Sequence, residues 1–590
     1  MNKFHDAAFR CLLCLLFISI EAAHCRPPED PIKCRSGDSH CTITNTYGVY
    51  PDRTTCQASK VAYPTTLSEV ISIVANGTKS QMKMKVGTKH YHSIPKLACP
   101  GGKYGLIIST KNLNRIIEFN LAARTVTVES GVLLRTLIDE AGKVGLALPQ
   151  APYWWGVTVG GMLGTGAHGS TLWGKGSAVH DYVVSMTLVS PGTSADGYVK
   201  VREIKETNPD LAAAKVSLGM LGVIYRVTIA LEQMFKRSIT YKEMADVDLG
   251  ERVADFGKQH EFADIVWYPS QQKAMYRIDD RVPLTTLGNG LYNFIPFRST
   301  ASLALAAIRI AEEGQELFKD SNGKCILGKF FTSTLKTAAY GLTNDDNFFF
   351  GYPVVGFQNR MQSSGTCLDS QNESLHSGCA WDPRVNGEFF LQSAFSIGLS
   401  KAKIFIEDVK SLVKLDPSAL CGLELYNGIV MRYVTNSSAV LGKEEDAVDF
   451  DITHYRSKDP MEPRLHEDAL EEIEQMAIFK YGAIPHWGKN RPVAFEGVAG
   501  KYRGYQEFLR VKNLYDPEKY FSNEWNEQVL GLKAGLTVDS DGCALEGLCR
   551  CSQDRHCAPD KNYFCKPGKV YRDARVCTFV SNHGNVGAAK

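Results

Sequence analysis

Apolar side chains recur at every second position in several segments of the N-terminal half, which predicts half-buried strands. The alternation is clearest in residues 125–129, 182–188 and 223–231. Residues 134–141 instead carry apolar side chains at the three- and four-residue spacing of an amphipathic helix. Strands and helices mixed in this way predict an α+β domain that ends near residue 235.

The pattern starts again from residue 236, where we expect a second domain. Residues 262–268 have the pattern of a strand, and residues 301–312 that of a strongly apolar helix. A chain of 590 residues is too long for one hydrophobic core. The pattern and the length together predict an α+β protein with one domain over residues 56–235 and another over residues 236–537.

The N-terminus has the order of a secretory signal peptide. Lys3 and Arg10 precede an apolar run over residues 11–20, and small residues follow it. We therefore expect a signal peptide over residues 1–25, with an uncleaved anchor as the alternative, and a cysteine-containing lead-in over residues 26–55. A run of ten apolar residues is too short to span a bilayer. The expected location is the secretory pathway, ending outside the cell, in the cell wall or in an endomembrane compartment.

Cysteine usage agrees with export. Six of the 17 cysteines lie in the C-terminal segment, residues 538–590, at Cys543, Cys549, Cys551, Cys557, Cys565 and Cys577. A segment with so little apolar content needs cross-links, and disulfides form in oxidising compartments, although six cysteines allow 15 pairings. A zinc site that includes His556 is the alternative. Glycosylation sequons at Asn76, Asn372 and Asn436 also fit export.

The overall charge argues against one class of partner. The 66 basic and 64 acidic residues nearly cancel, and no long run of one sign is present. Binding to a phosphate backbone requires a basic surface. Nucleic acid is therefore not an expected partner.

Glycines concentrate in the stretch 158–170, TVGGMLGTGAHGS. Glycine destabilises the interiors of helices and strands, so we expect an irregular loop whose bare backbone makes tight turns or approaches a ligand closely. Exposed amides of such a loop can bind a pyrophosphate. A purely structural cluster of turns is the alternative, and the spacing does not match the dinucleotide fingerprint G-x-G-x-x-G of a strand followed by a helix.

An ordered set of motifs resembles one family of flavoproteins. The N-terminal part carries VGTKHYHS (86–93), TVESG (127–131), the glycine stretch and LGMLGVI (218–224). The C-terminal part carries WYP (267–269), PHWGK (485–489) and DPEKYFSNEW (516–525). Together these motifs, over roughly residues 50 to 530, resemble the vanillyl-alcohol-oxidase type flavoproteins. Within that family they are similar to the aldonolactone oxidases, specifically the plant type of L-gulonolactone oxidase.

The resemblance implies an FAD-binding domain of the PCMH type followed by a substrate, or cap, domain of the aldonolactone oxidase type. FAD would extend through the first domain with its ring at the domain interface. The residues that the resemblance assigns to the cofactor are Gly87, Thr88, His92, Ser93, Gly160, Gly161, Gly164, Thr165, Gly166, His168, Gly222 and Val223. No metal site is expected.

The implied reaction is oxidation of a sugar 1,4-lactone at C2 to give ascorbate, with oxygen reduced to hydrogen peroxide. Loss of the hydroxyl proton needs a base or a nearby cation. His486 and Lys489 lie three residues apart and are close enough to act on one ligand. Family members carry a Glu-x-Arg pair on a strand of the second domain; here Arg432 keeps the arginine, but Val430 stands where the glutamate would be.

Two further points follow from the resemblance. Members that attach FAD covalently use a histidine in G-x-G-H-S, and His92 with Ser93 keeps the last pair, whereas counting from Val86 selects His90. Covalent attachment through His92 is therefore one of two open alternatives. A different carbohydrate or sugar-alcohol oxidase, an enzyme that uses an acceptor other than oxygen, and a secreted flavin- or carbohydrate-binding protein without lactone activity remain alternatives for the function.

Overall fold

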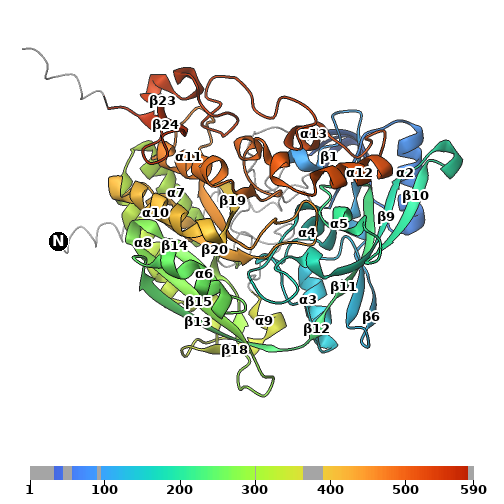
Figure 1. The fold of residues 1–590 in the computed structure, drawn as a ribbon, viewed down its shortest axis with the longest axis horizontal. Coiled ribbons are helices and arrows are strands. Elements are labelled where there is room, and N and C mark those ends of the chain that lie inside the picture. The colour runs from blue at the N-terminus through green and yellow to red at the C-terminus, as the bar shows by residue number, and fades with distance from the viewer. Residues whose placement is uncertain (1–31, 44–55, 89–94, 299–300, 363–389, 582–590) are drawn as a thin grey trace, which may run out of the picture.

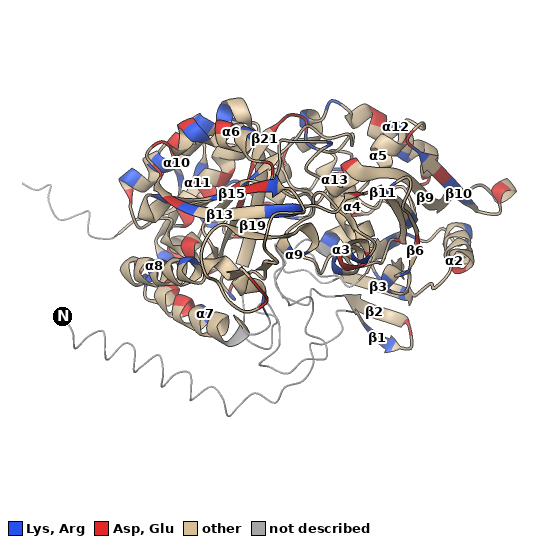
Figure 2. Cartoon of the chain, turned by 90° about the horizontal axis from the view of Figure 1, so that it is seen from below, with Lys and Arg blue, Asp and Glu red and all other residues tan. Residues whose placement is uncertain are grey.

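The computed structural model describes residues 32–43, 56–88, 95–298, 301–362 and 390–581. The expected signal peptide, His90, His92, Ser93 and Asn372 lie outside these residues. Figure 1 shows two lobes side by side, the first in blue to teal and the second in green to orange. Both lobes combine helices and sheets, which confirms the α+β expectation. Acidic and basic residues are interspersed along the elements of both lobes (Figure 2).

Two five-stranded sheets form the first lobe. One has the order β1 (Ile32–Ser36), β2 (Ser39–Ile43), β3 (Cys56–Ala62), β5 (Leu106–Ser109) and β4 (Met84–Gly87). The other has the order β10 (Val199–Lys205), β9 (Val183–Pro191), β11 (Val223–Ala230), β7 (Thr125–Glu129) and β6 (Ile116–Asn120). The helices of this lobe that precede residue 236 are α2 (Leu67–Lys79), α3 (Leu134–Lys143), α4 (Val159–Thr165) and α5 (Leu211–Ala214). The lead-in strands β1 and β2 thus extend the first sheet and are joined by disulfide Cys34–Cys41, while Cys56–Cys99 joins β3 to the segment that follows β4.

One eight-stranded sheet forms the second lobe. Its order is β18 (Val354–Phe357), β13 (Lys236–Ala245), β15 (Lys273–Val282), β14 (Asp264–Tyr268), β20 (Ile429–Val434), β21 (Ala447–Tyr455), β19 (Phe390–Gly398) and β22 (Ile484–Pro485). Its main helices are α6 (Leu249–Gln259), α7 (Ser302–Leu317), α8 (Ser321–Thr337), α10 (Leu399–Leu415) and α11 (Glu467–Gln475). The apolar stripes of α6, α10 and α11 pack on the sheet and bury Phe395, Phe405 and Phe450. Among the described residues, no helix is long and apolar enough to cross a membrane.

The chain returns to the first lobe after β22. Helices α12 (Tyr505–Tyr515) and α13 (Glu524–Val529) bury Phe508 and Trp525 in the same core as α3 and β11. This packing differs from the division expected from the sequence, which places all of residues 236–537 in the second domain. The reason is that the apolar stripes of α12 and α13 match the first core, so the loop with Trp487 crosses between the lobes.

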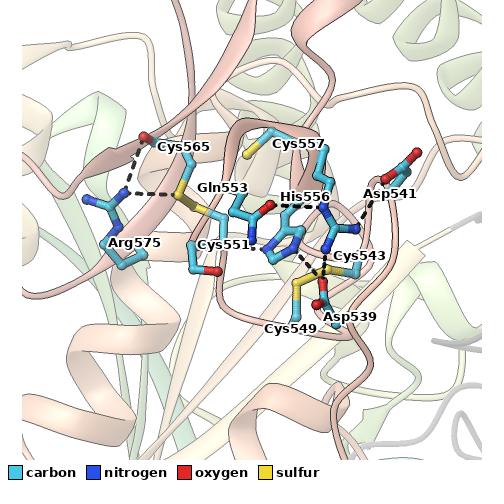
Figure 3. The surroundings of a disulfide bond; sticks show 12 residues. Asp539, Asp541, Cys543, Cys549, Cys551, Gln553, His556, Cys557, Cys565 and Arg575 are labelled. Carbon is cyan, nitrogen blue, oxygen red and sulfur yellow. Dashed lines mark hydrogen bonds and ion pairs between the residues drawn. A yellow bond between two sulfur atoms is a disulfide. The ribbon is translucent and has the colours of Figure 1, made fainter.

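The C-terminal segment forms a small disulfide-bonded module with one hairpin, β23 (Tyr563–Pro567) and β24 (Arg575–Phe579). Its bonds are Cys543–Cys549 and Cys551–Cys565 (Figure 3), together with Cys557–Cys577. The zinc alternative is wrong here, because these sulfur atoms are bonded to one another and are not thiolate ligands. Both ring nitrogens of His556 also have protein partners, Asp539 and the amide of Ser552.

The module is fixed to helix α11 through one carboxylate. Glu472 accepts hydrogen bonds from the backbone amides of Lys569, Val570 and Tyr571, each at 2.6 Å. Glu472 is fully buried. The module is therefore a docked part of the second lobe.

Candidate active site

A cavity of about 570 Å³ lies between the two lobes. The first lobe contributes the glycine stretch and the ends of strands, among them Gly87, Thr88 and Thr110. The second lobe contributes side chains of β14, β19, β20 and β21, and the loop after β22. A ligand that spans this cavity contacts both lobes.

The glycine stretch is not a loop throughout. Residues Val159–Thr165 form helix α4, capped by the Thr158 hydroxyl, and Gly166 ends it with φ 71°. The expectation of an irregular loop is therefore wrong for this segment. Gly160 explains why this glycine-rich segment is helical. A Cβ at this position would lie 3.0 Å from Cβ of Ser130, so the helix can pack this closely only because the residue is glycine.

Gly164 has a different surrounding. A Cβ at Gly164 would meet no protein atom within 4 Å, and the residue lines the cavity. Nearby, the Ser130 hydroxyl oxygen is buried and has no hydrogen-bond partner among the described residues. Bare backbone and an unused polar atom beside a cavity fit a bound ligand with polar groups, and so fit the FAD implied by the motifs.

The structure brings most of the expected cofactor residues together. Those that line the cavity are Gly87, Thr88, Gly160, Gly161, Gly164, Thr165, His168 and Gly222. Gly166 lies behind them as the cap of α4, and Val223 points into the core of the first lobe, where it is fully buried. Ile224 takes the position on the cavity wall, because successive strand residues face opposite sides.

All three expected catalytic residues line the cavity: Arg432, His486 and Lys489. They come from separate segments, with Arg432 on β20 and the other two in the loop that follows β22. Arg432 is 6% exposed, and it donates a hydrogen bond to Asp451 Oδ2 at 3.0 Å. Lys489 Nζ donates to the same oxygen at 2.5 Å. Two cations therefore lie beside the cavity and share one carboxylate.

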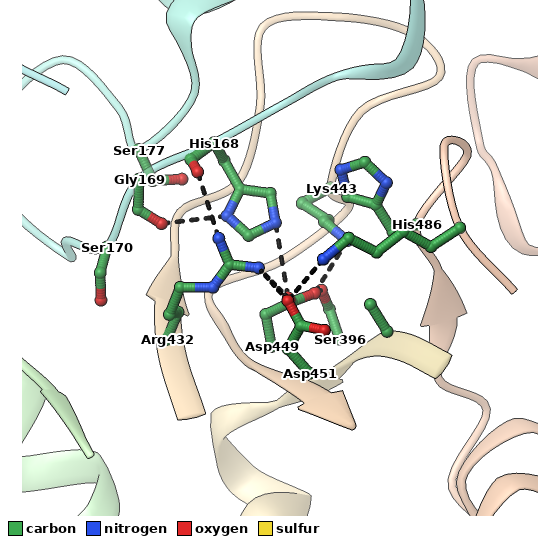
Figure 4. Close-up of polar contacts among 12 residues, drawn as sticks. His168, Gly169, Ser170, Ser177, Ser396, Arg432, Lys443, Asp449, Asp451 and His486 are labelled. Atoms are coloured by element: carbon green, nitrogen blue, oxygen red, sulfur yellow. Dashed lines mark hydrogen bonds and ion pairs between the residues drawn. The ribbon is translucent and has the colours of Figure 1, made fainter. Parts of the chain in front are cut away.

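A second carboxylate, Asp449, lies two residues earlier on β21 (Figure 4). Arg432 Nη2 and Lys443 Nζ lie 3.2 and 3.4 Å from its oxygens, and Ser396 Oγ donates to Oδ1 at 2.7 Å. Burial favours the neutral acid, but the cations Lys443 and Arg432 outweigh it and hold the pKa of Asp449 well below its usual range. Asp449 is therefore a buried anion that positions Arg432.

Two histidines complete the polar wall, with ring centroids 5.5 Å apart. Burial lowers the pKa of His168 to about 3 and that of His486 well below its usual value. Both are neutral at physiological pH. Because Nδ1 of His486 accepts the amide N–H of Gly488 at 3.0 Å, its proton is on Nε2. His486 thus offers a donor and is not the general base.

The structure identifies site residues that the motifs did not. Ser130, Leu218 and Gly219 line the cavity inside motifs already noted, Ser217 lines it just before one of them, and Asp451 lines it from β21. Asp449, Asp451 and Thr453 alternate along β21, and this row of polar residues was the available signal. The lining also includes six aromatic side chains: Tyr241, Tyr292, Phe294, Phe297, Phe331 and Tyr340.

Comparisons with known proteins agree with this geometry. Residues 58–195 match the model of an FAD binding domain, residues 369–529 that of D-arabinono-1,4-lactone oxidase, and residues 540–579 that of the L-gulonolactone oxidase 2-like C-terminal domain. From Arabidopsis thaliana, "Probable L-gulonolactone oxidase 6" is 59% identical over 96% of this chain and 94% of its own. "L-gulonolactone oxidase 5" is likewise 59% identical, over 96% of both chains.

Among solved structures, a "Solvent-stable cholesterol oxidase" is similar with a TM-score of 0.65 and 15% identity. The match covers 86% of this chain and all of that one. At this identity the likeness shows the fold alone.

Proposed function

The chain belongs to the plant L-gulonolactone oxidase family, and from that premise we propose that it oxidises L-gulono-1,4-lactone at C2. The C2–H bond breaks with loss of a hydride, the hydroxyl loses its proton, and the 2-keto lactone rearranges to ascorbate. Oxygen takes up the two electrons and two protons and leaves as hydrogen peroxide. FAD, when bound, supplies the two-electron acceptor.

One observation carries the proposal: Arg432, His486 and Lys489 converge on the same cavity as the glycine residues of α4. Two cations and a neutral N–H donor stabilise negative charge that develops on the substrate oxygen as its proton leaves. Buried Asp449 holds Arg432 in place, and the lobes enclose the reacting groups. The chain thus supplies position and electrostatics for the redox chemistry.

The cellular location of the protein is also part of the proposal. We place the enzyme in the secretory pathway, on the basis of the N-terminal sequence and of disulfides in both lobes, such as Cys56–Cys99 and Cys325–Cys421. The sequon residues Asn76 and Asn436 are both exposed on the surface. A fusion that follows the expressed chain through the pathway, together with glycosidase digestion, tests this location.

The experiment that tests the activity is a substrate and acceptor panel on purified, flavin-loaded protein. We expect turnover of L-gulono-1,4-lactone with hydrogen peroxide formed under air. Turnover of a sugar alcohol but of no lactone would show that the substrate is a sugar alcohol and not the lactone. Turnover only with an artificial acceptor would make the enzyme a dehydrogenase.

A further inference from the structure

The position of Val430 leaves the site without the carboxylate that family members place there, but the neighbouring strand offers one. In the antiparallel pair of β20 and β21, Val430 lies directly opposite Asp451. Side chains opposite each other in such a pair lie on the same face, with Cβ atoms about 4.5 to 5.5 Å apart. Both residues line the cavity. A carboxylate from position 451 therefore reaches the region that a side chain at position 430 occupies.

The hydrogen bonding of Asp451 leaves acceptor capacity unused. Arg432 and Lys489 both donate to Oδ2, whereas Oδ1 has no hydrogen-bond partner among the described residues. An ionised carboxylate accepts about four hydrogen bonds. The side chain is 16% exposed, but Oδ1 itself is buried, so the other atoms of the side chain make the contact with the cavity.

Asp449 provides an internal comparison on the same strand. Its side chain is fully buried, and three neighbours, Ser396, Lys443 and Arg432, surround its carboxylate. It is absent from the cavity wall. The two aspartates therefore differ in role, since Asp449 is enclosed by protein and Asp451 borders the space where a substrate would lie.

Resting on the proposed function, we propose that the Asp451 carboxylate replaces the missing glutamate and accepts a hydrogen bond from a hydroxyl group of the lactone. A neutral hydroxyl donor suits this carboxylate because Arg432 and Lys489 already balance its charge. The ligand class is thus a polyhydroxylated lactone, bound through one hydroxyl. Asp451 makes the site selective for substrates that carry this hydroxyl.

The first test compares Asp451→Asn with wild type in the flavin-loaded enzyme, using L-gulono-1,4-lactone and its monodeoxy derivatives. We expect kcat/KM for the lactone to fall about 10- to 100-fold, the range for loss of a hydrogen bond to a charged group. The derivative that lacks the hydroxyl group bound by Asp451 should be a poorer substrate than the lactone for wild type. For Asp451→Asn, the two compounds should have similar kcat/KM. A merely structural role would not move this selectivity. Asp346→Asn, which removes an exposed aspartate paired with Arg360, is the control and should match wild type.

The second test moves the carboxylate back to the facing strand. Asp451→Ala should lose activity, and the double variant Val430→Glu with Asp451→Ala should recover at least about 10-fold of the lost kcat/KM. A double variant whose kcat/KM is no higher than that of Asp451→Ala would contradict the proposal that Asp451 replaces the missing glutamate. Flavin content and the melting temperature report whether each variant is folded.

The outcomes separate the inference from the function on which it rests. If wild type itself does not oxidise the lactone, the proposed function fails, and the inference falls with it. If wild type is active but Asp451→Asn keeps the same kcat/KM and the same selectivity, the inference alone is overturned.

Discussion

His168 Nε2 lies 3.5 Å from Asp449 Oδ2, so a residue of the glycine stretch contacts a central strand of the other lobe. The contact is not an ion pair at neutral pH, because burial keeps His168 neutral. A hydrogen bond between the lobes comes from Arg432, which donates to the His168 carbonyl oxygen at 3.4 Å. The polar cluster around Asp449 therefore fixes the two lobes on either side of the cavity.

Removing the charge of Asp449 should destabilise the protein strongly. In Asp449→Asn, the buried cations Arg432 and Lys443 lose their shared anion, which typically costs about 3 to 5 kcal/mol. We expect a lower melting temperature and loss of bound flavin. Asp346→Asn, which breaks an exposed ion pair, should cost at most about 1 kcal/mol. Equal stability of the two variants would contradict the role given to Asp449.

Gly164→Ala should separate protein stability from cofactor binding. Alanine at this helical position meets no protein atom within 4 Å, so the flavin-free protein should gain about 0.5 to 1 kcal/mol. If FAD lies against this backbone, its affinity should fall. Gly314→Ala in α7 is the matched control, because it also adds a methyl group to open space in a helix but lies off the cavity wall. Unchanged flavin affinity in Gly164→Ala would remove α4 from the cofactor site.

His486 should act as a hydrogen-bond donor. His486→Gln keeps an N–H donor, whereas His486→Leu has none, so the leucine variant should lose about 10- to 100-fold more kcat than the glutamine variant. Because burial holds the pKa of both His486 and His168 below their usual value, neither should produce an inflection in kcat between pH 5 and 8. An inflection near pH 6.5 that disappears in His486→Gln would show that this histidine titrates during turnover.

The stability of the flavin-free protein should rise with pH through Lys85. Its ammonium group donates to the carbonyl oxygens of Leu218 and Gly219, and burial lowers its pKa to about 7 from 10.5. The unfolded chain therefore binds one more proton between these values, so the free energy of unfolding increases by up to about 1.4 kcal/mol per pH unit. Lys85→Met lacks this contribution. Urea unfolding from pH 7 to 9 should show the difference between wild type and variant widening, and parallel curves would contradict it.

The sequence predicted residues that line the cavity, whose roles stay predictions, but it did not predict all of the local structure. Arg432, His486 and Lys489 were found through motifs, because the resemblance places them without any knowledge of how the chain folds. Helix α4 was not predicted, because glycine content argues for a loop unless the position of Ser130 is known. Helices α12 and α13 pack on the first lobe through contacts between residues that are far apart in the sequence, and local periodicity does not predict such contacts.

The position of Asp451 in the active site also depends on long-range contacts that the sequence pattern does not predict. Its alternation with Asp449 and Thr453 is visible in the sequence, but its relation to Val430 is a matter of strand register. Register depends on which strands become neighbours, and β20 and β21 are joined by a long connection. The sequence alone does not show that a carboxylate at position 451 lies where one at position 430 would lie. The pairing of the two strands in the structure shows it.

The most direct test of the whole account is anaerobic mixing of the flavin-loaded enzyme with L-gulono-1,4-lactone, followed by the flavin absorbance. The account predicts that the oxidised flavin band bleaches, that ascorbate forms in equal amount, and that air restores the band with release of hydrogen peroxide. A flavin band that stays unchanged at saturating lactone would contradict it.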